Sequence, residues 1–238
     1  MQLFYQPDLN EESREVEFSR EESAHISRVL RKKIGDHLEI TNGAGMIFSC
    51  EMTAMSKKAC IARVLRTRRF PPPPYHLHLA VAPTKMNDRY EWFLEKATEI
   101  GVQEITPVYC ERSERRTVKK DRLERVLQSA LKQSLQVYLP VLNEPMSLEH
   151  FVAQDLPGQK FIAHCEEQSE KIHLLNALEK EKQIHILIGP EGDFSPEEIQ
   201  QALNNQWRPV SLGENRLRTE TAAIVACTSV ANKFVSGF

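Results

Sequence analysis

Two short segments contain the residues whose types and spacing could do chemistry. Residues 184–198 read IHILIGPEGDFSPEE, and residues 210–226 read VSLGENRLRTETAAIVA. Glycines follow an apolar run in both, and a glycine loop lets main-chain amides and carbonyls approach a ligand without obstruction by side chains. Such groups suit an adenine edge, and the neighbouring Ile188, Leu212 and Leu217 could enclose a flat heterocycle. Tight turns alone would also account for these glycines.

Charged residues gather in the second segment. Arg216 and Arg218 lie in its loop, and Glu220 lies where a helix begins. A glutamate at such a position could take part in catalysis. Glu220 would also favour the positive end of the helix dipole, so a purely structural role is an equal alternative.

The first segment is a strand, a loop and a helix start. The run 184–188, apolar except for His185, is typical of a strand buried on both faces, and it ends at a Gly-Pro-Glu-Gly bend. Ser195 can cap the helix that follows, Pro196 fits its first turn, and Glu198 completes a capping box. This order predicts a βα unit whose loop begins at Gly189.

The second segment repeats that plan. A short strand at 209–212 precedes the loop, and Thr219 could cap an apolar helix over residues 222–234. Loops that leave neighbouring strand ends of an α/β sheet are where such folds bind ligands. We therefore expect one ligand between the two loops.

The rest of the chain divides at a run of four prolines, residues 71–74, because proline can neither pair inside a sheet nor continue a helix. Residues 1–70 alternate apolar runs with turn signals, which predicts a small β-barrel interrupted by a helix at 21–30. Residues 75–238 alternate strands with helices, which predicts a mostly parallel sheet. The further elements expected there are strands 76–82, 105–109 and 161–165 and helices 88–100 and 119–137.

The amino-acid composition is typical of a globular protein, but it does not indicate what the protein binds. The 238 residues carry a formal net charge of -2, so nucleic-acid binding must rest on local clusters such as the basic stretches 57–69 and 112–125. Solvated faces explain those clusters equally well. The 5 cysteines are scattered, so we expect reduced thiols, no metal site and a cytoplasmic protein. No apolar run approaches the ~20 residues of a membrane span.

Four motifs resemble one family. They read HISRVLRKKIGD, KMNDRYEWFLEKATEIGVQEITPVYCERS, LIGPEGDFSPEEI and VSLGENRLRTETAAIVA, in this order over nearly the whole chain. They resemble the bacterial 16S ribosomal RNA (uridine-N3) methyltransferases, the RsmE family of the knotted SPOUT class. The chain departs from the family after KQS, where a Gly-Arg pair is expected and Leu135-Gln136 stands instead. That departure weakens any RNA contact assigned to this stretch.

The resemblance implies the fold, the cofactor and the partners. It implies a PUA-like β-barrel for RNA at 1–70, the linker 71–74, and an α/β SPOUT domain at 75–238 whose C-terminal part is threaded into a trefoil knot. It also implies a homodimer, with helix 222–234 as a natural contact, and 16S rRNA or the small ribosomal subunit as substrate. The cofactor is S-adenosylmethionine, and the implied cofactor-binding residues are Ile188, Gly189, Pro190, Glu191, Gly192, Leu212, Gly213, Leu217, Thr219, Thr221 and Ala222.

Methylation at N3 of uridine requires removal of the N3 proton, because the neutral imide nitrogen has no free lone pair. Our hypothesis is that Arg218 stabilises negative charge on the uracil oxygens, and that Glu220 or Glu191 acts as the base or orients that arginine. Basic residues of both domains are expected to contact RNA phosphates. These are Arg28, Arg31, Lys32, Lys33, Lys85, Arg89 and Arg112.

Two other function classes stay open at this point. One is a non-catalytic RNA-binding or ribosome-assembly factor on the same fold, and the other is a nucleotide enzyme that uses GPEGDF as a phosphate loop. The sequence lacks GxxxxGK[ST] and has no GxGxxG after the first strand of the large domain, which argues against a conventional nucleotide triphosphatase and the usual dinucleotide fold. Binding of S-adenosylmethionine would separate the three classes.

Overall fold

The computed structural model describes residues 2–56, 59–166 and 171–234, and Lys57 and Lys58 of the first basic stretch lie outside them. The chain divides into two compact units. The barrel unit is Met1–Pro72 with Leu131–Leu139, and the sheet unit is Pro73–Ala130 with Pro140–Phe238. The division therefore falls within the proline run.

The barrel unit contains a curled sheet of 5 strands in the order β1-β3-β4-β5-β2. Its strands are antiparallel except for the parallel pair β1–β3. One cluster of buried apolar side chains, which includes Phe4, Ile40 and Phe48, fills its interior. The elements are β1 (Leu3–Tyr5), β2 (Glu15–Glu17), α1 (Arg20–Ala24), η1 (His25–Val29), β3 (His37–Thr41), β4 (Met46–Met55) and β5 (Cys60–Arg69). The helix predicted at 21–30 is present, but its second half, η1, is a π-helix.

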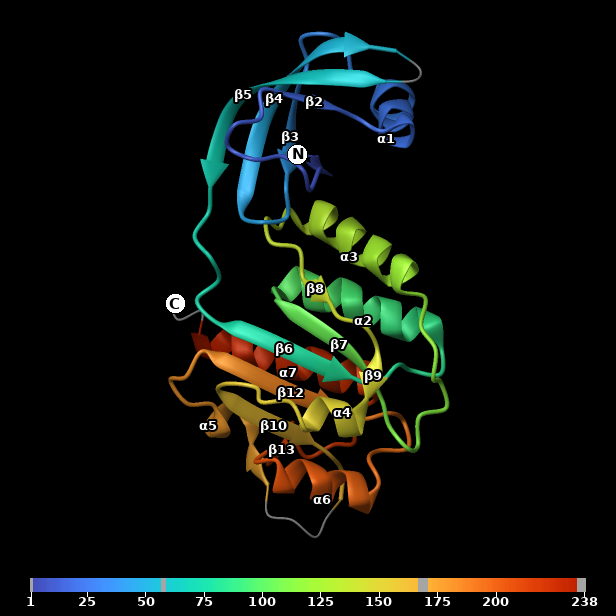
Figure 1. The fold of residues 1–238 in the computed structure, drawn as a ribbon, viewed down its shortest axis with the longest axis vertical. Helices are drawn as coiled ribbons and strands as arrows, with labels where there is room; N and C mark the ends of the chain where they lie inside the picture. Colours follow the sequence, from blue (N-terminus) through green and yellow to red (C-terminus); the bar gives the residue numbers. More distant parts are fainter. Residues whose placement is uncertain (1, 57–58, 167–170, 235–238) are drawn as a thin grey trace. The chain divides into compact units, whose positions relative to one another are not determined.

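The sheet unit is built on an 8-stranded sheet whose main path runs β11-β13-β10-β12-β6-β7-β8, with β9 paired to β7. Every pairing in it is parallel, which confirms the predicted parallel α/β sheet (Figure 1). The strands are β6 (His76–Val81), β7 (Glu104–Tyr109), β8 (Val141–Leu142), β9 (Met146–Ser147), β10 (Gln159–Ala163), β11 (Ile172–His173), β12 (Gln183–Ile188) and β13 (Arg208–Ser211).

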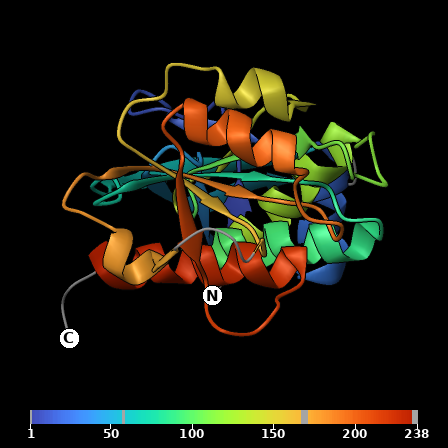
Figure 2. The ribbon, with the colours of Figure 1, turned by 90° about the horizontal axis from the view of Figure 1, so that it is seen from below.

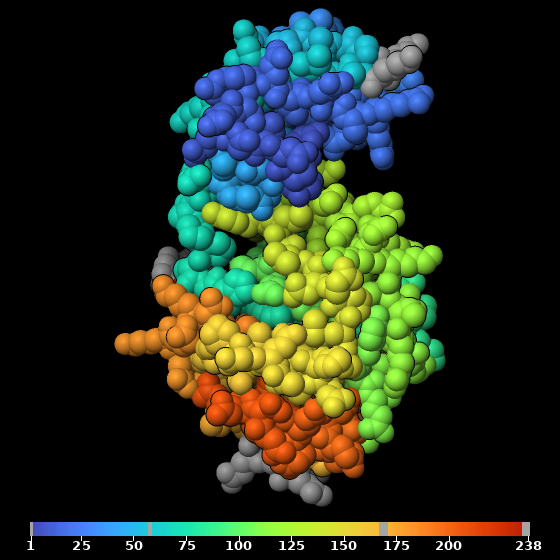
Figure 3. Space-filling view, viewed as in Figure 1, coloured from blue at the N-terminus to red at the C-terminus, as the bar shows by residue number. Residues whose placement is uncertain are grey.

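Helices cover both faces of this sheet. Helices α2 (Asn87–Ile100) and α7 (Thr219–Phe234) pack together on one face, where α5 (Leu174–Ala177) also contacts α7 (Figure 2). Helices α4 (Leu148–Val152) and α6 (Pro196–Asn204) pack together on the opposite face, and their side chains adjoin in the space-filling view (Figure 3). Because both faces are covered, the central strands are buried, and Ile184–Ile188 of β12 is fully buried as predicted.

Helix α3 (Lys120–Ser134) ends earlier than the predicted residue 137. Leu135 has φ 58°, in the left-handed region that glycine adopts most easily, and the helix stops there. This is the position at which the resembled family has glycine. The chain then runs along the barrel unit, where the Tyr138 hydroxyl donates to the Phe70 carbonyl at 2.9 Å. The departure from the family pattern thus falls on a backbone position that disfavours a leucine side chain.

A directed chain of hydrogen bonds crosses β6, β7 and β12. The Pro157 carbonyl can only accept, so His185 Nε2, 2.9 Å away, carries a hydrogen. The Nδ1 atom of a neutral His185 then accepts from His78 Nδ1 at 3.2 Å, and His78 Nε2 accepts from the Thr106 hydroxyl at 2.7 Å. The two rings cannot both be charged, because two Nδ1 hydrogens would then face each other across this contact. Burial lowers the pKa of His78 to about 4, against the opposing effect of Glu104, and burial also lowers the pKa of His185.

Acid should therefore destabilise the sheet unit before most carboxylates protonate. Below about pH 6.5 the unfolded chain binds protons that the folded His78 and His185 do not, so the unfolding free energy falls towards about pH 4. The expected loss approaches about 1.4 kcal/mol per pH unit for His78, and His185 adds to it. Urea unfolding at about pH 7.5, 6 and 5 measures it. The variant His150→Gln, which removes an exposed histidine of α4, should show the same loss, and a pH-independent stability would contradict the account.

Candidate functional site

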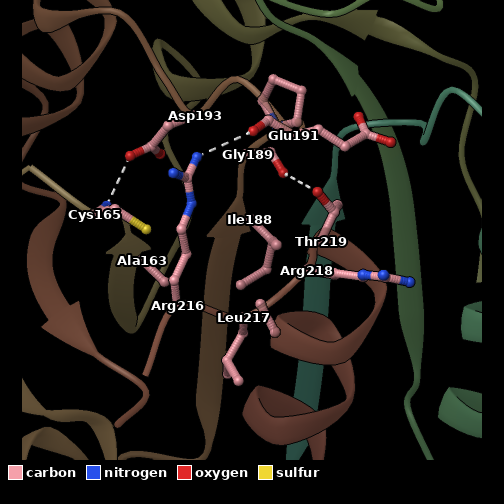
Figure 4. Close-up of a pocket in the computed structure, with 12 residues that line it drawn as sticks. Ala163, Cys165, Ile188, Gly189, Glu191, Asp193, Arg216, Leu217, Arg218 and Thr219 are labelled. Carbon is pink, nitrogen blue, oxygen red and sulfur yellow. Dashed lines mark hydrogen bonds between the residues drawn. The ribbon is translucent and has the colours of Figure 1, made fainter. Parts of the chain in front are cut away.

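A pocket of about 260 Å³ lies where the loops after β10, β12 and β13 meet (Figure 4). Its apolar wall is formed by Ala163, Ile188, Leu217 and Ala222. The two loops that the sequence predicted to share a ligand are therefore neighbours. Four charged side chains line the rest of the pocket together with four other residues. The full set is Cys165, Gly189, Pro190, Glu191, Asp193, Arg216, Arg218 and Thr219.

Thr219 joins the second segment to the first. Its hydroxyl donates to the Gly189 carbonyl at 3.0 Å, and its residue is buried (Figure 4). Thr219 is the first residue of α7, so the helix starts three residues before the predicted Ala222 and the threonine hydroxyl does not cap it. The prediction of a capping role was wrong because a carbonyl of another strand end, not a free amide of α7, is the partner of this hydroxyl.

The segment 189–198 binds three more loops through its acidic side chains. Asp193 accepts from the Cys165 amide at 2.7 Å, in the loop after β10. Glu191 accepts from the Lys85 amide at 3.0 Å, in the loop after β6. Glu198 accepts from the Glu111 amide at 2.8 Å, just beyond β7, while its other oxygen completes the predicted capping box of α6. Hydrogen bonds to an ionised acceptor are stronger than neutral ones, so these contacts fix the loops around the pocket.

The glycines serve the site for different reasons. A side chain at Gly189 would press its Cβ to 3.0 Å from the Phe194 ring, and one at Gly192 would reach 3.1 Å from Arg112 Cβ. Gly213 instead has φ 143°, which disfavours other residues, with open space around it. Gly192 does not line the pocket. Gly189 is therefore packed against its own loop while it lines the pocket, and Gly192 is packed against Arg112 of the loop after β7.

The two arginines of the second segment diverge. Arg216 rises between Glu191 and Asp193 and donates to the Glu191 carbonyl at 3.5 Å (Figure 4). Arg218 points away from that pair, and its side chain makes no ion pair or hydrogen bond within the described part of the chain. Both are exposed and both line the pocket. Arg216 was noted in the sequence as a charged residue but was not predicted as a site residue.

The three predicted catalytic residues do not all face the pocket. Arg218 and Glu191 line it, whereas Glu220 lies beside it in the first turn of α7. Glu220 is 8% exposed, and its Oε1 atom is 3.9 Å from Arg89 Nε. Thr221, predicted to bind the cofactor, is half-buried and is not among the lining residues.

A second pocket of about 440 Å³ adjoins the first and shares five of its residues. Leu212 and Gly213, both predicted cofactor-binding residues, line it, together with His164 and Lys171. His164 is 7% exposed, and neither of its ring nitrogens has a hydrogen-bond partner within the described residues. The two pockets form a continuous region around the loop 212–217.

Sequence reasoning missed Ala163, Cys165 and Asp193, which line the first pocket. The loop after β10 has no glycine and no charge pattern that marks a site. Its place could have been inferred from topology, because the carboxyl ends of neighbouring parallel strands meet at one edge of a sheet.

The predicted phosphate-contacting residues differ in whether their side chains already have a hydrogen-bond or ion-pair partner in the structure. Arg28, Arg31 and Lys33 of the barrel unit are exposed, whereas Lys32 donates to the His37 carbonyl at 2.9 Å. In the sheet unit, Lys85 pairs with Glu114 at 2.7 Å, Arg112 donates to the Gly192 carbonyl at 3.2 Å, and Arg89 adjoins Glu220. Arg112 therefore also has a structural role in the loop after β12.

Two features are absent from the described residues. No group of three or more histidine, cysteine, aspartate or glutamate side chains there could hold a metal ion. None of the helices there is long and apolar enough to cross a membrane.

Comparison with known proteins identifies the family. An RNA methyltransferase domain model matches residues 71–231, and an RNA methyltransferase PUA domain model matches residues 18–65. The ribosomal RNA small subunit methyltransferase E of Buchnera aphidicola is 31% identical over 91% of this chain and 88% of its own length.

Solved structures agree with this result. The crystal structure of a protein from Porphyromonas gingivalis, described as a "probable rRNA-methyltransferase", is 40% identical with a TM-score of 0.88 over 98% of both chains. That of ribosomal RNA small subunit methyltransferase E from Neisseria gonorrhoeae, bound to S-adenosylmethionine, is 25% identical with a TM-score of 0.86, covering 98% of this chain and 97% of the other. The resemblance in the sequence is confirmed: this chain belongs to the RNA methyltransferase family, as a relative of the ribosomal RNA small subunit methyltransferase E proteins.

Proposed function

We propose that this chain transfers a methyl group from S-adenosylmethionine to N3 of a uridine in 16S rRNA of the small ribosomal subunit. The observation that carries the proposal is the pocket at the meeting of three loops, with an apolar wall for a flat heterocycle and two carboxylates at its rim. The Neisseria gonorrhoeae relative with this fold was crystallised with the same donor.

The residues of the pocket fit this donor. Ile188, Leu217 and Ala163 offer apolar contact to an adenosyl group, and exposed main-chain groups can bind its edge. Glu191 and Asp193 place negative charge next to a ligand that carries a positive sulfonium. When bound, S-adenosylmethionine supplies an electrophilic methyl group and leaves as a neutral thioether.

Glu191 is the better placed of the two candidate bases. One of its oxygens holds the Lys85 amide, and Glu191 and Arg218 are both lining residues of the pocket. The carboxylate takes the N3 proton while N3 forms its bond to the methyl carbon. Arg218, whose guanidinium has no partner within the described residues, stabilises the negative charge that develops on the uracil oxygens.

Replacement of Arg218 tests this mechanism. The variant Arg218→Ala should lower methyl transfer by roughly 100-fold or more, because removal of one charge-stabilising donor typically costs that much, while S-adenosylmethionine affinity changes less than about 3-fold. Transfer of labelled methyl to small subunits, followed by mass spectrometry of nucleosides, measures the rate and identifies 3-methyluridine. The matched control is Arg14→Ala, an exposed arginine outside both basic stretches.

Full activity in Arg218→Ala would exclude the assigned role. A wild-type chain that binds rRNA but neither binds S-adenosylmethionine nor methylates would instead support the non-catalytic assembly factor.

We further propose that RNA phosphates contact the exposed cations Arg28, Arg31 and Lys33, with Lys32, Lys85, Arg89 and Arg112 as additional contacts. Neutralising Arg28, Arg31 and Lys33 together should flatten the plot of log affinity against log salt by roughly 2, since each lost phosphate contact removes about 0.7–0.9 from the slope. Filter binding of 16S rRNA at several salt concentrations measures the slope. An unchanged slope would refute the contacts.

A homodimer and a trefoil knot are part of this proposal. Ile224, Val225 and Thr228 of α7 are only half-buried, and Trp92 on the adjoining α2 is 43% exposed, so the two helices present an apolar face that suits a second copy. Sedimentation should give about twice the 27.4 kDa of one chain, and a monomer would contradict the dimer. For the knot, the supporting feature is the return of the chain from β13, which lies between β11 and β10, to α7 beside α2, and an experimental chain trace tests it.

A further inference from the structure

Glu220 is a buried carboxylate whose surroundings do not suit a proton acceptor. Its residue is 8% exposed, and its Oε2 atom is buried without a hydrogen-bond partner within the described residues. Its Oε1 atom is 3.9 Å from Arg89 Nε, the cation to which it is paired. A general base must come within hydrogen-bond reach of the proton that it takes, and Glu220 does not line the pocket. A buried carboxylate needs a cation, however, because burial without one is costly.

Arg89 lies beside the wall of the pocket that carries Glu191. Helix α2 begins at Asn87, directly after the loop that follows β6, and β6 pairs with β12 up to Val81 and Ile188. The amide of Lys85 in that loop is bound by the Glu191 side chain. Arg89 therefore stands where the loop after β6 meets the start of α7, next to the donor pocket but outside its lining.

The guanidinium of Arg89 faces Glu220 with one edge, and the Arg89 side chain is partly exposed to solvent. Its Nε faces Glu220, and its side chain is 41% exposed. A guanidinium is a planar fork that binds phosphate through two parallel hydrogen bonds, and a carboxylate that fixes the plane lowers the cost of forming them.

We infer that Glu220 is a positioning residue: it holds the Arg89 guanidinium beside the methyl-transfer site, where Arg89 binds a phosphodiester of the RNA strand next to the target uridine. The inference rests on the proposed function. It gives Glu220 a role in binding RNA, which differs from the roles of Glu191 and Arg218 in the chemistry.

A double-mutant cycle tests the inference, with Glu220→Gln, Arg89→Ala and the combination measured for the KM of rRNA, kcat, donor affinity and melting temperature. Arg89→Ala should raise the KM of rRNA about 10-fold and Glu220→Gln several-fold, with kcat and donor affinity within about 3-fold of wild type. The combination should be no worse than Arg89→Ala alone, because Glu220 acts through Arg89. Glu220→Asp should recover part of the loss.

The control is Glu95→Gln, which makes the same charge change on α2 at a carboxylate paired with Lys96, and it should leave the KM of rRNA unchanged. Additive effects in the double variant, or a fall in kcat at unchanged KM, would overturn the inference. A lower melting temperature with lost donor affinity in both single variants would overturn it as well, since that marks a structural pair. Failure of the proposed function gives a different result, because the wild-type protein would then not methylate rRNA. The same four proteins could still be compared by their affinity for rRNA, which would test the inference by itself.

Discussion

Hydrogen bonds join four connections of the sheet unit to one segment, residues 189–198. The pocket depends on these hydrogen bonds, which are called the ties below. Three carboxylates of the segment and its Gly189 carbonyl each accept a hydrogen bond from a different part of the unit: the loops after β6, β7 and β10, and the start of α7 after β13. Parallel strands bring their carboxyl ends to one edge of the sheet, but they do not by themselves set the distances between the loops. Hydrogen bonds to ionised acceptors do so, and they are directional enough to hold a cavity open between apolar walls.

In this arrangement, two acidic residues hold loops in place and also put negative charge at the pocket. Asp193 uses one oxygen for the Cys165 amide and the other for the Phe194 amide, yet it still lines the pocket. Glu191 likewise binds the Lys85 amide at the pocket rim. Negative charge thus remains beside a site proposed for a cationic sulfonium, while the arginines 216 and 218 point to different sides of it (Figure 4). The proposed function accordingly assigns attraction of the donor to the carboxylates and stabilisation of a substrate anion to Arg218.

Local signals in the sequence predicted the elements well. The buried strand at 184–188 and the capping box of Ser195 and Glu198 were predicted from adjacent residues, and both are present. The ties between loops were not predictable in that way, because they join residues 28, 87 and 106 positions apart. Nothing in the residues around Cys165 marks that loop, and its place follows only from the strand order. Thr219 was read as a cap for the same reason, since its partner lies 30 positions away.

Titration calorimetry with S-adenosylmethionine on wild type, Asp193→Ala and Glu197→Ala tests the central claim most directly. Asp193→Ala removes one tie, and Glu197 is an exposed neighbour in α6. The account predicts binding by wild type, a loss of affinity of about 10-fold or more in Asp193→Ala, as expected for a charge-assisted hydrogen bond, and no change in Glu197→Ala. Equal affinity in all three proteins, or no binding by wild type, would contradict it.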